Sequence, residues 1–293
     1  MEQLKIGIFG NCQVSSWQSM IHANFDDIEI LKTKHVTQGS VLTDVEIQLI
    51  SECDLILKVK SDRGEQPGES YSLAFKDREI IEVPSLVFSG FHPDVCYVTF
   101  NGAMVKNFFL KDWNSRILYW SFQNGLGVSE ALSLFNAEVF EELGYFSTPR
   151  ISRDQLRENF SSCNFDFDLW MQKVQREGNF MLGPNHPKLV AFSALADQLG
   201  TKIGRTPKIP RRLINTYSVD PLANDFVWPV HLPIADYLGI EYSDRVRSGD
   251  EYMNFEEFAT NCFKFWSTLE IDPNESLIGG SNYHDAILDK FSA

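Results

Sequence analysis

Cys12 is the first residue in this chain whose side chain could act as a nucleophile. It stands in Gly10-Asn11-Cys12-Gln13, directly after the apolar segment 4–9 and directly before a segment with helical periodicity. In open α/β sheets the carboxyl end of a strand is where ligands bind. Exposed N–H groups and the dipole of a following helix would favour a thiolate, which is a competent nucleophile. The alternative is a small cysteine that merely packs the strand end.

The neighbours of Cys12 fit a ligand-binding turn. Gly10 permits a tight turn, and the side-chain amides of Asn11 and Gln13 could bind an oxyanion or a phosphate. The other four cysteines lie in apolar or plain helical settings, so we interpret them as packing residues: Cys53, Cys96, Cys163 and Cys262.

A thiolate needs a base, and three histidines stand beside or near a proline. They are His92 in GFHPD, His186 in GPNHPK and His231 in WPVHLP. Asp94 could orient the imidazole of His92, as in a nucleophile–base–acid triad. His186 precedes Pro187 and is expected to cap a helix, whose dipole would keep the ring neutral and suited to a base. The alternative for each is a structural turn histidine.

Two basic clusters could hold phosphate groups. The first follows the third predicted strand, at its carboxyl end, and the second lies in the irregular stretch after residue 200. The clusters are Lys58, Lys60 and Arg63, and Arg205, Lys208, Arg211 and Arg212. The alternative for both is a solvated loop.

Composition narrows the class of protein. The chain has 293 residues, 43% of them hydrophobic and 23% charged, which is typical of a globular protein with a sizeable core. The 23 Phe and six Trp are better explained as core than as a surface for sugar rings or adenine. A formal net charge of −14 argues against nucleic-acid binding but not against a local pocket for an anion.

The sequence also predicts a compartment. The five cysteines form no CxxC pair, so neither a zinc site nor a disulfide framework is indicated, and we expect no metal. No signal-peptide pattern opens the chain, and no apolar run reaches the ~20 residues that span a bilayer. We therefore expect a cytoplasmic protein with reduced thiols and no membrane insertion.

Alternating apolar and amphipathic segments predict a small parallel sheet in the N-terminal part, joined to a mainly helical C-terminal part. The expected division is 1–125 and 126–293, packed as one continuous unit. Expected strands are 4–9, 28–32, 54–60 and 80–88, the last better suited to an edge because of Pro84. Expected helices are 14–25, 41–51, a helical face over 128–143, 153–160 capped by Ser152, 166–177, 187–199 ended by Gly200, and 255–269.

These motifs together resemble a known family. The segments KIGIFGNCQ, FSGFHPD, NHPKLVAFSALADQLG and WPVHLPIADYLGI look like those of the WcbI-type polysaccharide-biosynthesis acetyltransferases, in the family's order and over most of the chain. In the loop after the third strand this chain departs from the family's pattern, reading KVKSDRGEQPGES.

The resemblance implies a protein that binds coenzyme A and transfers an acetyl group from acetyl-CoA to a sugar hydroxyl of a capsular or surface polysaccharide. It places Cys12 at the family's GNCQ cysteine, and His92 and His186 at its two His-Pro positions, with Asp94 beside the first. Ligand contacts are expected from six residues: Gly10, Asn11, Gln13, Lys60, Arg63 and Asn185.

Two other functions stay open at this level. Strand, glycine, small nucleophile and helix is also how the nucleophile turn of an esterase is built, so a hydrolase with a cysteine nucleophile is one alternative. A non-catalytic protein that binds coenzyme A or a nucleotide-sugar is the other. Within the transferase, the acyl group could pass through Cys12 or go directly to the hydroxyl.

Overall fold

The computed structural model describes residues 3–37, 39–60, 69–271, 275–279, 288 and 290. The chain forms two compact units. Unit 1 contains residues 1–87, 154–180 and 186–223, and unit 2 contains residues 88–153, 181–185 and 224–293. The units are therefore interleaved along the chain, whereas the division expected at residue 125 is contiguous.

Unit 1 is built on a parallel sheet of four strands, in the order β2-β1-β3-β4. All three neighbouring pairs are parallel. This confirms the predicted α/β class with a small parallel sheet. The strands are β1 (Leu4–Gly10), β2 (Ile28–His35), β3 (Leu55–Val59) and β4 (Glu79–Val83). Because β4 is an edge strand, Pro84 directly after it removes no inner ladder hydrogen bond.

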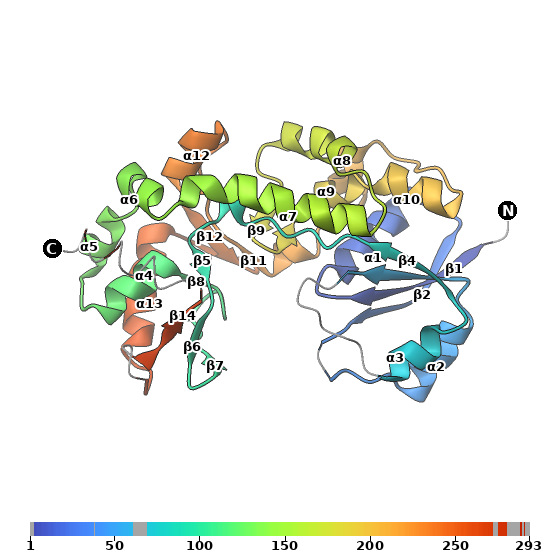
Figure 1. The fold of residues 1–293 in the computed structure, drawn as a ribbon, viewed down its shortest axis with the longest axis horizontal. Helices are drawn as coiled ribbons and strands as arrows, with labels where there is room; N and C mark the ends of the chain where they lie inside the picture. The colour runs from blue at the N-terminus through green and yellow to red at the C-terminus, as the bar shows by residue number, and fades with distance from the viewer. Residues whose placement is uncertain are drawn as a thin grey trace. The chain divides into compact units, whose positions relative to one another are not determined.

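Helices cover both faces of this sheet (Figure 1). Alternation along β1 sends Phe9 to one face, where it packs with Ile50 of α2 (Asp44–Ser51) and Phe75 of α3 (Glu69–Phe75). The buried residues Ile6 and Ile8 point to the opposite face, which α1 (Val14–Asn24) covers. The sheet is thus doubly wound, and its carboxyl edge carries the Cys12 turn.

The rest of unit 1 is helical, and it corrects two predicted helix boundaries. Helix α7 begins at Thr148, so Ser152 lies inside it and does not cap it; residues 154–162 of α7 belong to unit 1. The segment predicted as one helix from residue 187 to 199 is two helices, and Gly204, with φ of +66°, ends the second. The further elements are α8 (Phe167–Val174), η3 (Gln175–Glu177), β10 (His186–Pro187), α9 (Leu189–Ser193), α10 (Ala196–Ile203), η4 (Arg211–Leu213) and α11 (Ile214–Tyr217).

Gly200 has a packing role rather than the predicted stop role. It lies within α10, where an added Cβ would stand 2.4 Å from the carbonyl oxygen of Arg205. The glycine therefore lets the chain after α10 return against the helix. A separate contact joins α1 to α9: the ring of Trp17 packs edge-on against that of Phe192, with centroids 5.6 Å apart.

Unit 2 combines short strands with helices, whereas the part of it within residues 126–293 was predicted to be mainly helical. Its strands are β5 (Val95–Cys96), β6 (Val98–Phe100), β7 (Ala103–Met104), β8 (Asn114–Ser115), β9 (Met181–Gly183), β11 (Phe226–Val227), β12 (Arg245–Ser248), β13 (Glu251–Asn254) and β14 (Leu277–Ile278). Its helices are η1 (Ser89–Phe91), α4 (Arg116–Gln123), α5 (Val128–Ser133), α6 (Ala137–Glu142), η2 (Tyr145–Ser147), α12 (Leu232–Leu238) and α13 (Phe255–Trp266), while η5 (Leu222–Asn224) lies at the boundary with unit 1.

The aromatic residues fill the core of unit 2. Trp113, Tyr119, Trp228, Phe258 and Trp266 are all buried in one cluster. Edge-to-face contacts join them, as between Tyr119 and Trp266, whose centroids are 4.9 Å apart. These contacts support the interpretation of the aromatic residues as core. Across the part of the chain that the structure describes, no helix has the length and apolar character needed to cross a bilayer.

Candidate functional site

Cys12 and His186 form the candidate reactive pair, and both belong to unit 1. The Sγ atom of Cys12 lies 3.8 Å from Nε2 of His186, within range of a hydrogen bond to sulfur. Cys12 is partly exposed, whereas only 4% of His186 is accessible. A thiol that can pass its proton to a neighbouring imidazole is the arrangement that activates cysteine nucleophiles.

The end of β1 positions Cys12. Gly10 has φ of +150°, and an added Cβ would lie 2.6 Å from Cβ of Val59 and 2.9 Å from its carbonyl oxygen. Only glycine therefore fits where β1 passes β3. Helix α1 begins at Val14 with Gln13 as its N-cap, so Cys12 stands one residue before the cap. This confirms that the thiol lies at a carboxyl edge, close to a helix start.

His186 reaches the thiol from a different setting than predicted. It lies in the short strand β10, and α9 begins only at Leu189 with Lys188 as its N-cap. The prediction that His186 caps a helix is wrong, because Pro187 and Lys188 continue in extended backbone before the helix starts. The feature of this ring that bears on chemistry is consequently its contact with Cys12 and not a helix dipole.

Asn11 and Gln13 hold the turn in place. The Gln13 side chain donates from Nε2 to the carbonyl oxygen of Leu86 and accepts from the Leu86 N–H at Oε1, each at 2.9 Å. Asn11 donates from Nδ2 to Oγ of Ser85 at 2.8 Å. Gln13 is fully buried. Both side chains predicted to bind ligand thus also clamp the Cys12 turn to the segment 84–87.

Asn159 of α7 completes this clamp. Its Nδ2 donates to the carbonyl oxygen of Ser85 at 2.7 Å, so the segment beside the Cys12 turn is held from two sides. Neither Ser85 nor Asn159 was identified from the sequence. No local pattern marks them, because their partners lie 74 residues away along the chain.

Lys60 follows β3 at the same edge of the sheet. Its N–H donates to the carbonyl oxygen of Val83 at 2.9 Å, and its ammonium group contacts the hydroxyl of Ser162 at the end of α7. Its neighbour in the basic cluster, Lys58, pairs with Glu82 at 2.9 Å. Arg63, the third member, lies outside the described residues.

His92 and Asp94 belong to unit 2, and the carboxylate of Asp94 does not bond to the imidazole. Its oxygens accept from Ser115 Oγ, from the Ile117 N–H at 3.1 Å and from the Tyr145 hydroxyl at 3.1 Å. Burial outweighs these bonds and raises the pKa of Asp94 to about 6. Asp94 therefore ties β8 and the start of α4 to η2, whereas orienting His92 was the predicted role.

The other two predicted contributors also lie in unit 2. Asn185 follows Pro184, whose carbonyl oxygen accepts from the Phe88 N–H at 2.7 Å. His231 is packed against Phe135 and Phe255, with ring centroids 4.8 and 4.6 Å away. Burial lowers the pKa of His231 to about 3, so the ring is neutral at physiological pH. This environment is typical of a histidine with a structural role in the core.

The second basic cluster is neutralised by acidic residues of unit 1. Arg205 pairs with Asp27 at 2.6 Å, Lys208 pairs with Asp26, and Glu177 accepts from Arg211 at 2.6 Å with Arg212 at 3.7 Å. These pairs fasten the segment after α10 to the turn between α1 and β2 and to η3, so the cluster is structural.

The remaining cysteines and one surface hollow do not add a second reactive centre. Cys53, Cys96, Cys163 and Cys262 are buried, as expected for packing residues, and desolvation raises the pKa of Cys53 to about 11.

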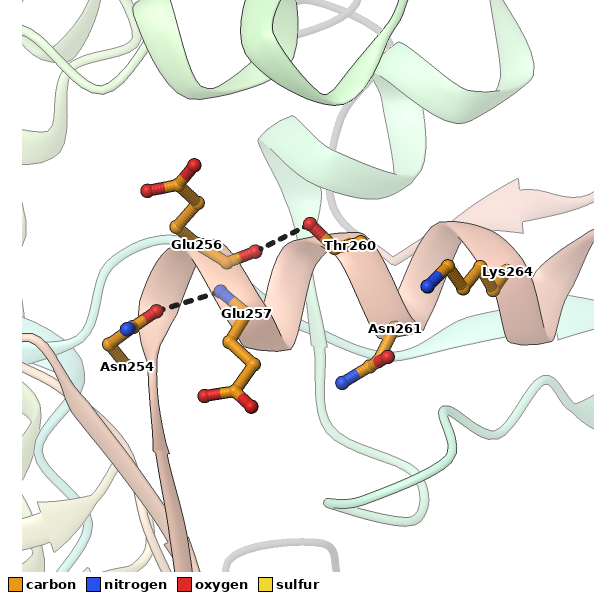
Figure 2. Close-up of a pocket in the computed structure, with 6 residues that line it drawn as sticks. All are labelled: Asn254, Glu256, Glu257, Thr260, Asn261 and Lys264. Carbon is orange, nitrogen blue, oxygen red and sulfur yellow. Dashed lines mark hydrogen bonds between the residues drawn. The ribbon is translucent and has the colours of Figure 1, made fainter.

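A hollow of about 400 Å³ lies along α13 (Figure 2). It is lined by amide, carboxylate, hydroxyl and ammonium groups, from Asn254, Glu256, Glu257, Thr260, Asn261 and Lys264, and by neither a thiol nor an imidazole. Within the described ranges, no three His, Cys, Asp or Glu side chains gather as metal ligands would.

A doubly wound parallel sheet with a thiol–imidazole pair at its carboxyl edge defines an α/β protein of the class that binds ligands at that edge. The chain belongs to the WcbI family of polysaccharide biosynthesis enzymes, whose family model matches residues 5–208. It is accordingly an enzyme with a role in polysaccharide biosynthesis.

A solved structure supports the fold. It is described as WcbI, a polysaccharide biosynthesis enzyme, in a native form without a disulfide bond between coenzyme A and one of its cysteines. The match has a TM-score of 0.65 at 13% identity and covers 99% of this chain and 95% of that one. No curated protein matches the sequence.

Proposed function

We propose that this enzyme transfers an acetyl group from acetyl-CoA to a sugar hydroxyl in polysaccharide assembly, with Cys12 as nucleophile and His186 as its base. The observation that carries the proposal is the 3.8 Å contact between Sγ of Cys12 and Nε2 of His186. Family membership supports the pathway. The description of the similar structure, which states that no disulfide bond joins coenzyme A to a cysteine in that form, names coenzyme A and so supports it as ligand.

The first step is thioester exchange. His186 Nε2 takes the proton of Cys12, and Sγ attacks the acetyl carbonyl carbon. The carbon–sulfur bond to coenzyme A then breaks, and the leaving thiolate takes the proton from the imidazolium. One thioester is replaced by another, so the exchange is close to thermoneutral and Cys12 is a suitable carrier.

The second step returns the enzyme to its starting state. Nε2 of His186 accepts the proton of the sugar hydroxyl, whose oxygen attacks the acetyl group on Cys12. The bond between the acetyl carbon and Sγ breaks, and the proton returns to sulfur. The products are an acetylated sugar and free coenzyme A. We place this reaction in the cytoplasm, where acetyl-CoA is available and free thiols persist.

The test measures coenzyme A release with and without a sugar acceptor, together with the mass of the intact protein. We expect acetyl-CoA alone to leave one acetyl group on Cys12 and to release one equivalent of coenzyme A per enzyme, and release beyond that equivalent to require an acceptor. Cys12→Ser should abolish transfer, whereas Cys53→Ser, the same chemical change at a buried position, should not. His92→Gln, in unit 2, tests the second predicted base.

Each alternative has its own result. Consumption of many equivalents of acetyl-CoA per enzyme without an acceptor indicates a hydrolase. Tight binding of coenzyme A with no turnover, even with a cell extract as the source of acceptor, indicates a binding protein. Full transfer by Cys12→Ala indicates direct attack by the hydroxyl and excludes the acetyl-cysteine route.

A further inference from the structure

The strand order of unit 1 singles out one gap at the carboxyl edge of the sheet. Chain order runs from β1 outward to β2 on one side and to β3 and β4 on the other, so the direction of winding reverses between β1 and β3. In open α/β sheets ligands bind at this reversal, and phosphate-bearing ligands are common there. Cys12 follows β1 and Lys60 follows β3, so both residues flank it.

β1 and β3 bring these two residues close to each other. Phe9 is in register with Lys58, and Gly10 lies directly against Val59. β1 and β3 therefore end side by side, and the chain continues from β1 into the Cys12 turn and from β3 into Lys60. The Lys60 N–H is held by the carbonyl oxygen of Val83, which fixes its position at the edge.

The charge of Lys60 is not neutralised by an acidic group of the described residues. Its ammonium group contacts a hydroxyl, that of Ser162, and Ser162 Oγ in turn donates to the carbonyl oxygen of Asn159 at 2.7 Å. Nearby cations have carboxylate partners: Lys32 and Lys34 pair with Glu46, and Lys58 pairs with Glu82. In a chain with a formal net charge of −14, a cation at the ligand-binding edge that has no carboxylate partner among the described residues is available to an anion.

We propose that Lys60 and Ser162 form a phosphate subsite beside the reactive cysteine. The ammonium group supplies the charge, and the Ser162 hydroxyl, which accepts from it while donating to the Asn159 carbonyl oxygen, holds it in position. This inference rests on the proposed function for the source of the phosphate. That source is the coenzyme A half of the donor or a phosphorylated sugar acceptor, which share the same chemistry.

Direct binding tests the subsite without any turnover. Inorganic pyrophosphate is titrated into the full chain by calorimetry, and the titration is repeated at higher salt. We expect Lys60→Gln to weaken binding by about tenfold or more, as for a lost charge-assisted hydrogen bond, and Lys60→Arg to keep most of it. Ser162→Ala should weaken it less. Lys58→Gln is the matched control, with the same charge change on the same strand, and should bind as the unmodified chain does.

Kinetics then identify the source of the phosphate. If the donor supplies it, Lys60→Gln raises KM for acetyl-CoA but leaves the rate with acetyl-pantetheine, which has no phosphate, unchanged. If the acceptor supplies it, Lys60→Gln lowers the rate equally with acetyl-CoA and with acetyl-pantetheine, and it does so only when the acceptor is phosphorylated. Equal pyrophosphate affinity of Lys60→Gln and the unmodified chain overturns the proposal. Absence of acetyl transfer, with the pyrophosphate result intact, overturns the proposed function instead.

Discussion

The sulfur of Cys12 lies 3.8 Å from Nε2 of His186, although 174 residues separate the two in the chain. The imidazole is almost wholly buried, and the thiol is partly exposed. The pair therefore has one member open to a reagent and one shielded from it. Because the thiol is partly exposed, its reactivity can be measured in the native protein.

Cys12 should react with iodoacetamide near neutral pH faster than the four buried cysteines. His186→Gln removes the proton acceptor and should slow the reaction, by about tenfold for each unit by which the thiol pKa rises. The measurement is peptide mass spectrometry over a series of pH values, with coenzyme A expected to protect Cys12. His22→Gln, on α1 of the same unit, is the control and should not change the rate. Labelling of Cys12 only after denaturation would show that the cysteine is packing.

Gln13→Ala should destabilise unit 1 even though no contact to His186 is lost directly. The substitution leaves the N–H and the carbonyl oxygen of Leu86 without their side-chain partner in a buried setting. Each of the two unsatisfied groups costs about 1–3 kcal/mol, so we expect a loss of ~2–6 kcal/mol in the free energy of unfolding. Denaturant unfolding measures it, and Gln48→Ala on the exposed side of α2 is the control. An unchanged unfolding midpoint for Gln13→Ala would contradict the clamp.

Much of the fold of unit 1 could be predicted, because the sequence patterns that indicate its strands and turns lie within short segments of the chain. Apolar runs separated by amphipathic segments predict parallel strands, and Gly10 before Cys12 predicts a turn at a strand end. The partner of Cys12 was harder to predict. His186 was one of several histidines near a proline, and only tertiary packing distinguishes it from His92 and His231.

The errors in the predicted helices have physical causes. Ser152 has the residue type of an N-cap, but α7 starts earlier, at Thr148, because Pro149 suits a first turn. Gly200 has the residue type of a stop, but it is required by the close approach of Arg205. Residues 126–293 were predicted as mainly helical because the strands in this part, several of them two residues long, are too short for a period-two pattern.

Asp94 should support folding in a manner that depends on pH. Its pKa is raised from 3.8 to about 6 in the folded protein, so the folded state holds a proton that the unfolded state has lost between these values. The contribution of Asp94 to stability therefore declines as pH rises from about 4 to about 6, by about 1.4 kcal/mol per pH unit. The side chain of Asp94→Asn cannot ionise. The difference in unfolding free energy by which this variant is less stable than the unmodified chain should therefore shrink as pH rises over this range. Tyr145→Phe removes one bond but keeps the carboxyl group, and its curve should retain the dependence. A constant difference between Asp94→Asn and the unmodified chain would contradict the raised pKa.

His231 should act in the opposite direction below neutral pH. Its pKa is lowered from 6.5 to about 3 by burial, and its Nε2 makes no hydrogen bond with the residues that the structure describes. Between these values the unfolded chain binds a proton that the folded one excludes. Stability should therefore fall as pH drops below about 6.5, by up to about 1.4 kcal/mol per pH unit. Because Asp94 has the opposite slope from about pH 4 to 6, the measurement is the difference in unfolding free energy between the unmodified chain and His231→Leu. That difference should be constant above about pH 7 and shift in favour of the variant as the solution is acidified. Phe140→Leu, which alters the same aromatic surrounding without removing the imidazole, should show no such shift, and parallel curves for His231→Leu would refute the assignment.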